Sequence, residues 1–105
     1  MYSLEYLPIA RQDLADIVRY ISHELFNPVA AERLACEMVE AAEKLVDFPY
    51  SHPCYHPIKP LEQEYRRLLV QNYIMFYSVD EAQKLITIVR VIYARRDYEK
   101  IIDTK

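Results

Sequence analysis

Arginine and tyrosine side chains are concentrated in the C-terminal half of this 105-residue chain. The arginines are Arg66, Arg67, Arg90, Arg95 and Arg96, and the tyrosines among them are Tyr65, Tyr93 and Tyr98. A guanidinium holds a phosphate through two hydrogen bonds, and an aromatic ring stacks on an unpaired base. The mixture therefore predicts a site for single-stranded RNA. The alternative is that these arginines only keep an exposed sheet face soluble. Successive strand residues point to opposite faces, so at most one of Arg66 and Arg67 belongs to a given site.

The distribution of charge agrees with this location. The formal net charge is -3, but residues 1–50 carry nine acids and four bases, whereas residues 51–105 carry seven acids and nine bases. The formal charges of the two halves are thus -5 and +2. We expect an anion to bind to the C-terminal half.

Arg90 lies inside an apolar run that extends from Ile86 to Ile92. A buried unpaired charge would be strongly destabilising, so Arg90 must reach solvent or have an acidic partner. A structural ion pair with Asp97 or Glu64 is favoured over direct contact with a ligand.

Three potential metal ligands, His52, Cys54 and His56, alternate in a proline-rich segment. Their spacing matches no common zinc pattern and no fourth ligand is near, so no metal site is predicted. Either histidine is a candidate general acid or base, because histidine alone has an unperturbed pKa near neutrality. Further candidates are Lys59, Glu62 and Glu64.

Several classes of protein are excluded by composition. Glycine is absent, which removes the P-loop, the dinucleotide-binding fingerprint and the nucleophile elbow, so no nucleotide cofactor is expected. Cys36 and Cys54 are too few for a disulfide framework and are expected to be free thiols. No apolar run is long enough for a membrane span, and a cytoplasmic location is predicted.

The N-terminal half predicts one strand and two helices. Residues 2–7 alternate as a strand does, and residues 9–25 repeat apolar side chains at helical spacing. A cap at Asn27 followed by Pro28 starts a second helix, which reaches Phe48 before Pro49 ends it. The two helices form a hairpin.

The C-terminal half predicts three strands, over residues 64–70, 73–79 and 85–93, which form an antiparallel meander. A short helix over residues 97–103 follows. The fold class is α+β, in the order β-α-α-β-β-β, with residues 1–105 as a single domain. The helical hairpin packs on one face of a small antiparallel sheet, and the other face is left for function.

The whole chain, over roughly residues 2–102, resembles the RelE/ParE superfamily of toxins. The resemblance is carried by Asp13-Leu14-Ala15-Asp16-Ile17-Val18-Arg19-Tyr20-Ile21, Asn27-Pro28-Val29-Ala30-Ala31, Phe48-Pro49, Glu64-Tyr65-Arg66-Arg67-Leu68, Tyr73-Ile74-Met75-Phe76-Tyr77 and the segment from Ile88 to Tyr98. It implies a toxin of a type II toxin–antitoxin module, neutralised by a small antitoxin whose extended or helical segment wraps the toxin.

The superfamily has two active branches, and the resemblance is shared between them. RelE-like members cut mRNA on the ribosome without a metal ion, and ParE-like members poison DNA gyrase. The first branch implies Arg66, Arg96 and Tyr98 as catalytic residues and Lys59, Arg67, Arg90 and Arg95 as substrate-binding residues. Ribosome-associated mRNA cleavage is the first expectation and gyrase inhibition the alternative. A third interpretation is an inactive protein that only binds the antitoxin.

Overall fold

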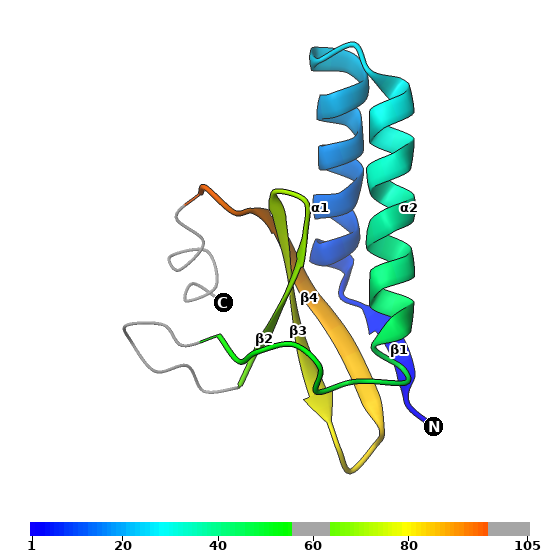
Figure 1. Ribbon diagram of the computed structural model, residues 1–105, viewed down its shortest axis with the longest axis vertical. Coiled ribbons are helices and arrows are strands. Elements are labelled where there is room, and N and C mark those ends of the chain that lie inside the picture. The colour runs from blue at the N-terminus through cyan, green and yellow to red at the C-terminus, as the bar shows by residue number, and fades with distance from the viewer. Residues whose placement is uncertain (56–63, 97–105) are drawn as a thin grey trace.

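A computed structural model describes residues 1–55 and 64–96 of the chain (Figure 1). Its elements are β1 (Ser3–Tyr6), α1 (Pro8–Arg19), the π-helical turn η1 (Tyr20–Glu24), α2 (Pro28–Lys44), β2 (Arg66–Val70), β3 (Tyr73–Asp80) and β4 (Leu85–Tyr93). The predicted α+β class and order of elements are confirmed. The short helix predicted over residues 97–103 lies outside the described residues.

Both predicted helices are present, but α1 begins one residue earlier than expected, at Pro8, and α2 ends at Lys44 instead of Phe48. Pro8 stands in the first turn of α1, where its missing N–H costs nothing, and α1 continues directly into η1. At the start of α2 the Asn27 side chain accepts a hydrogen bond from the Ala30 N–H at 3.1 Å. None of the helices in the described ranges is long and apolar enough to cross a membrane.

The sheet has the strand order β1-β4-β3-β2. Strands β2, β3 and β4 form the predicted antiparallel meander, with Tyr73 opposite both Val70 and Tyr93. One correction is needed: β1 pairs with β4 in parallel, so the sheet is mixed. The alternation in residues 2–7 suits either direction, and the direction is set by where the hairpin returns the chain to the sheet.

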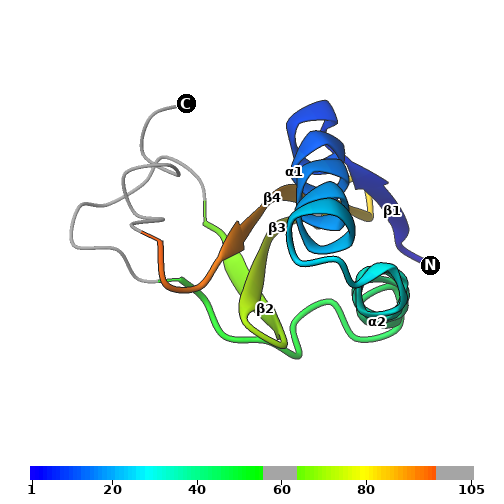
Figure 2. The same ribbon diagram turned by 90° about the horizontal axis from the view of Figure 1, so that it is seen from above.

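The main core lies between the helical hairpin and one face of the sheet, as predicted. Figure 2 shows both helices on the same side of the strands. Met38 of α2 packs there with Met75, Tyr77 and Ile88 of the sheet, and each of these side chains is at most 1% exposed. The Tyr77 hydroxyl is satisfied by donating to the Pro49 carbonyl at 2.8 Å.

The opposite face of the sheet is not bare. A second cluster of buried side chains forms on it, with Tyr65, Ile74, Phe76, Val89 and Ile92 as members. The segment after α2 joins this side, because Tyr55 N–H donates to the Tyr65 carbonyl and Arg67 N–H donates to the Pro53 carbonyl. Only part of the face that was expected to be left for function is therefore open.

Among residues 1–55 and 64–96, three adopt the left-handed backbone conformation that usually belongs to glycine, which this chain lacks. Gln71 and Lys84, each with φ of 53°, lie in the two hairpin turns, and Phe26, with φ of 52°, follows η1. A residue with a Cβ in this region costs about 1–2 kcal/mol. The tight turns are thus formed at a cost in stability.

Candidate functional site

Arg90 and Asp13 form an ion pair at the edge of the sheet. Asp13 accepts two hydrogen bonds from the Arg90 guanidinium, at 2.8 and 3.0 Å, and a third from the Val91 N–H at 2.9 Å. The pairing of β1 with β4 ends at Ile88, to whose carbonyl Leu7 donates, so the Asp13 carboxylate takes the place of a strand beyond this point.

This pair resolves the question that the buried arginine raised. The structural ion pair favoured for Arg90 is present, with Asp13 as its acid. Of the two acids suggested from the sequence, Glu64 pairs with Arg66 instead, and Asp97 lies outside the described residues. The two side chains are 21% and 14% exposed. Because its guanidinium is engaged in this way, a role for Arg90 in holding a substrate stays a prediction.

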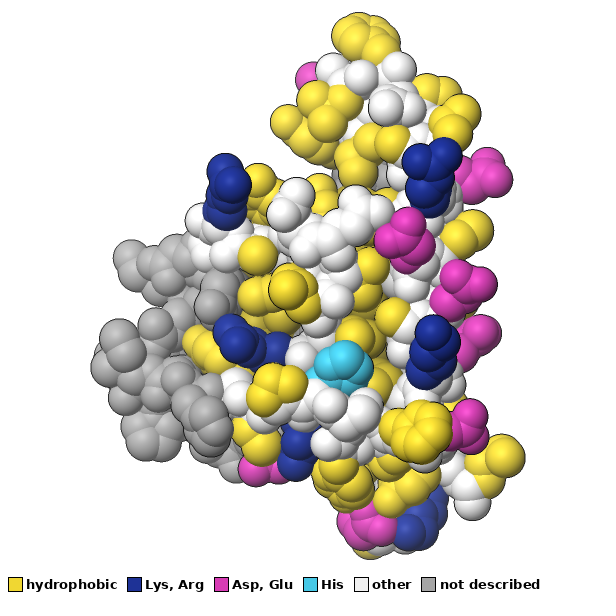
Figure 3. Space-filling model, viewed as in Figure 1, with side chains coloured by type: hydrophobic (Ala, Val, Ile, Leu, Met, Phe, Trp, Pro, Cys, Tyr) yellow, Lys and Arg dark blue, Asp and Glu magenta, His cyan; other side chains and the backbone are white. Residues whose placement is uncertain are grey.

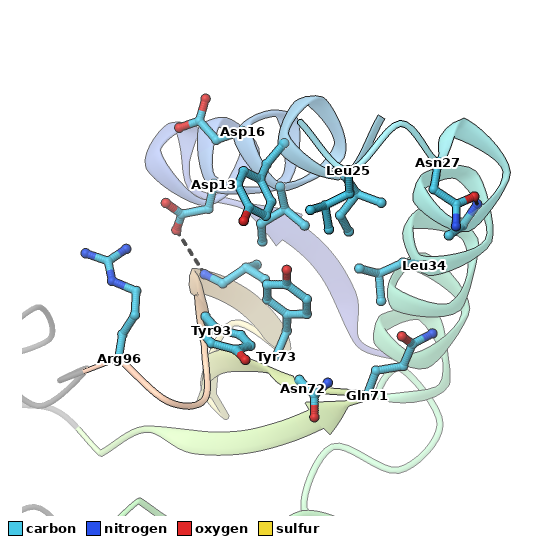
Figure 4. A pocket seen from close by; sticks show the side chains of 15 residues that line it. Asp13, Asp16, Leu25, Asn27, Leu34, Gln71, Asn72, Tyr73, Tyr93 and Arg96 are labelled. Carbon is cyan, nitrogen blue, oxygen red and sulfur yellow. Dashed lines mark hydrogen bonds between the residues drawn. The ribbon is translucent and has the colours of Figure 1, made fainter. Parts of the chain in front are cut away.

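A groove of about 740 Å³ separates the far part of the helical hairpin from the end of the sheet (Figure 4). Tyr20 and Leu25 line it from the hairpin, and Tyr73 and Tyr93 line it from the sheet, with their ring centroids 5.5 Å apart. Figure 4 shows Arg96 at one end of the groove. Aliphatic, aromatic and polar side chains all line the groove, which suits a peptide segment.

Arg66, the first predicted catalytic residue, is engaged with its own fold. Its guanidinium donates to the His52 carbonyl at 2.8 Å and lies over the Tyr50 ring, 4.9 Å from the centroid. Glu64 adds an ion pair at 3.8 Å, and the Arg66 side chain is only 18% exposed. These contacts hold the segment after α2 against β2.

The strand register also places Arg66 far from Arg96. Arg66 lies opposite Tyr77, whereas Tyr93, three residues before Arg96, lies opposite Tyr73. Four residues of β3 span about 13 Å, so the two arginines belong to different ends of the sheet. The structure does not bring them together, and their shared role on a phosphate stays a prediction.

A second depression, of about 480 Å³, lies on the open face of the sheet. His52, Arg67, Leu69 and Ala94 are among the residues that line it, and the Arg67 side chain is exposed. Burial lowers the pKa of His52, so its imidazole is neutral at neutral pH. Sequence reasoning named both residues but did not join them, because their proximity depends on the pairing of Pro53 with Arg67.

Two other predicted features can be placed. Tyr65 is 2% exposed, so its ring is not available for stacking on a base. Arg95 is exposed beside Arg96, in the turn after β4. Lys59 and Tyr98, which were predicted to bind substrate and to act in catalysis, lie outside the described residues. So do the acid–base candidates His56 and Glu62.

The surface charge and the Cys54 thiol bear on what the two depressions can bind. Figure 3 shows acidic side chains along the helical hairpin with a few basic ones among them, and basic side chains on the side of the sheet. Burial and the Glu64 carboxylate raise the pKa of the Cys54 thiol, which is therefore a poor nucleophile. Within residues 1–55 and 64–96 no three potential ligands gather into a metal site.

The family model of the ParE toxin of the type II toxin–antitoxin system parDE matches residues 4–98 of the chain. The chain belongs to this family. The resemblance to the RelE/ParE superfamily is thereby confirmed, and the protein is a type II toxin of that superfamily. No curated protein matches this toxin in sequence.

Solved structures show the same fold. The chromosomal ParDE system from P. aeruginosa aligns with a TM-score of 0.70 at 21% identity, over 90% of this toxin and 98% of that chain. The RelBE2 toxin–antitoxin complex from Mycobacterium tuberculosis gives 0.60 at 20% identity, over 88% and 96%. The isolated E. coli RelE toxin gives 0.54 at 14% identity, over 97% and 96%. At these identities the likeness concerns the fold.

Proposed function

We propose that this toxin arrests growth as ParE-like members do, by binding DNA gyrase, and that it does not cut mRNA. The observation that carries the proposal is the match of the ParE family model to residues 4–98. Gyrase inhibition was the alternative in the sequence analysis. It is now preferred over ribosome-associated cleavage.

The geometry of the predicted catalytic arginines supports this choice. Cutting RNA requires a positioned group to remove the 2′-hydroxyl proton and another to stabilise the leaving oxygen. Arg66 is committed to the His52 carbonyl and the Tyr50 ring, and Arg96 belongs to the other end of the sheet. Binding a protein target needs no such proton transfer, and the exposed Arg95 and Arg96 can serve it as contact residues.

Cleavage of mRNA remains the second candidate because of the depression on the open face. His52 and Arg67 line it together, so a neutral imidazole and an exposed guanidinium share one site. The imidazole would take the 2′-hydroxyl proton as the 2′-oxygen attacks phosphorus, and the guanidinium would hold the phosphate. The bond from phosphorus to the 5′-oxygen would break, and that oxygen would take a proton from solvent. Replacing His52 should therefore abolish mRNA cleavage and leave gyrase inhibition unchanged, which distinguishes the two candidate functions.

We also propose a cognate antitoxin as the stable partner. Two of the similar structures are toxin–antitoxin systems, ParDE and RelBE2. The groove between the hairpin and the sheet, lined by Tyr20, Tyr73 and Tyr93, is the concave surface that an extended or helical segment would fill.

The test is to induce the toxin without its antitoxin and to examine transcripts and DNA in the same cells. We expect intact transcripts, an induced DNA-damage response and inhibition of supercoiling by purified gyrase. The variant His52→Ala should act like the unaltered toxin. Cut transcripts without DNA damage, lost in His52→Ala but kept in the exposed-histidine control His23→Ala, would establish the nuclease instead. Normal growth would favour the inactive antitoxin-binding protein.

A further inference from the structure

The end of the helical hairpin carries an exposed apolar cluster, which we call the knob and define as Leu25, Phe26 and Val29. Their exposed fractions are 55%, 86% and 66%. Figure 1 shows the hairpin extending past the sheet, with the connection between the helices at its far end. Apolar side chains cover the same end of the molecule in Figure 3. Leu25 also lines the edge of the groove, whereas Phe26 and Val29 do not line it and project from the convex end of the hairpin into solvent.

The backbone holds Phe26 in this position at a cost. Its φ of 52° is left-handed, a conformation that asparagine or glycine adopts more easily than phenylalanine. The π-helical turn η1 leads directly into it. The strained backbone works against stability and the exposed aromatic ring against solubility, and strained residues cluster at functional sites.

The size of the knob indicates which kind of partner binds it. Its three side chains expose roughly 400 Å² of apolar surface, which is within the range of functional patches on monomers. One side of a stable dimer interface buries about 800 Å², so the knob is too small to hold a second copy of this chain by itself. It has the size of an aromatic anchor at the centre of a larger interface.

The shape of the knob indicates whether its partner is the antitoxin segment or a folded target protein. An antitoxin segment that wraps the toxin supplies side chains that fill concave surfaces, such as the groove beside Tyr20. A convex anchor instead needs a concave apolar pocket on its partner, and such pockets are largely preformed in folded proteins. The groove therefore fits the antitoxin, and Phe26 and Val29, which do not line the groove, fit the folded target.

We propose that Phe26, flanked by Leu25 and Val29, is the anchor that inserts into an apolar pocket of the protein whose binding arrests growth. The identity of that protein as DNA gyrase rests on the proposed function. The position of the anchor on the toxin does not.

The test uses Phe26→Asn in the full-length toxin, because asparagine tolerates left-handed backbone. The matched control is Phe48→Asn, which replaces another exposed phenylalanine, 66% exposed, beyond the opposite end of α2. We expect Phe26→Asn to weaken inhibition of purified gyrase at least tenfold and to abolish growth arrest. Its affinity for the antitoxin should stay within twofold, and its melting temperature should be unchanged or higher. The control should match the unaltered toxin in every assay.

Three outcomes would overturn the proposal: full growth arrest by Phe26→Asn, loss of antitoxin binding in that variant, or a dimer of the toxin that the substitution dissociates. If Phe26→Asn folds poorly, Val29→Ser tests the knob without changing the strained residue. We expect this variant also to weaken growth arrest and inhibition of gyrase. If the unaltered toxin has no effect on gyrase, the proposed function fails. The comparison of growth arrest between the two phenylalanine variants still decides the role of the knob.

Discussion

Replacing Asp13 by alanine should destabilise the toxin strongly, because this carboxylate connects α1 to the edge of β4. It accepts three hydrogen bonds, two from the Arg90 guanidinium and one from the Val91 N–H. The variant leaves an arginine without a partner in an environment where its side chain is only 21% exposed. The backbone N–H at the edge of the sheet also loses its acceptor.

The expected loss follows from the burial of the pair. Removing one partner of a fully buried ion pair costs about 3–5 kcal/mol. The Arg90 side chain is 21% exposed, so water can partly solvate the unpaired guanidinium in the variant. We therefore expect a loss of about 3 kcal/mol in the free energy of unfolding, at the lower end of that range. For a domain of about 100 residues this lowers the melting temperature by roughly 15 °C.

The assay is thermal and urea unfolding followed by circular dichroism, since the chain contains no tryptophan. The matched control is Asp16→Ala, in the same helix, whose carboxylate bonds Arg19 at 3.0 Å with both side chains more than half exposed. An exposed pair of this kind contributes little, so this control should be hard to distinguish from the unaltered toxin. Equal losses in the two variants would refute the reasoning. Asp13→Ala combined with Arg90→Met should recover part of the loss, because no charge is then left unpaired.

Two further predictions concern other parts of the fold. Hydrogen bonds from Lys84, Tyr2 and Tyr50 lower the pKa of Glu81 from 4.5 to about 2, so its contribution to stability is present above pH 4.5 and is lost as the pH falls towards 2. Melting curves of Glu81→Gln and the unaltered toxin should therefore differ at neutral pH and converge near pH 2, and a constant difference across this range would contradict the assignment. Asn27→Ala should lower the free energy of unfolding by about 1 kcal/mol through loss of the cap of α2, whereas Asn27→Asp should retain the cap. Urea unfolding of the two variants measures this contrast, and similar midpoints for both would show that the cap contributes little.

Much of the fold could be predicted because its signals are local. The apolar spacing of residues 9–25, the Asn27-Pro28 pair and the three β-rich segments each act through near neighbours in the chain, and each predicted an element that is present. The end of α2 was placed too late, at Phe48 instead of Lys44, because Pro49 marks where a helix must have stopped and not where it stops. Even the polar turn at Gln71 was evident, although the left-handed backbone there was not, since no glycine marks it.

The candidate site was predictable only in its residue types. Arg66, Arg67, Arg90 and Arg96 were singled out by charge, yet their surroundings depend on segments distant in sequence. Arg66 faces the carbonyl of a residue 14 positions earlier, and Arg90 faces an acid 77 positions earlier. No local pattern reports such partners.

The sequence by itself determined the elements, their order and membership of the toxin superfamily, since periodicity, caps and motifs act over a few residues. Only the tertiary structure decided that β1 lies parallel to β4, that Asp13 neutralises Arg90, and that Arg66 and Arg96 occupy different ends of the sheet. Each of these features depends on which segments distant in sequence come together, and the local patterns are compatible with more than one such arrangement. They are resolved when the hairpin packs on the sheet and each buried charge must find a partner.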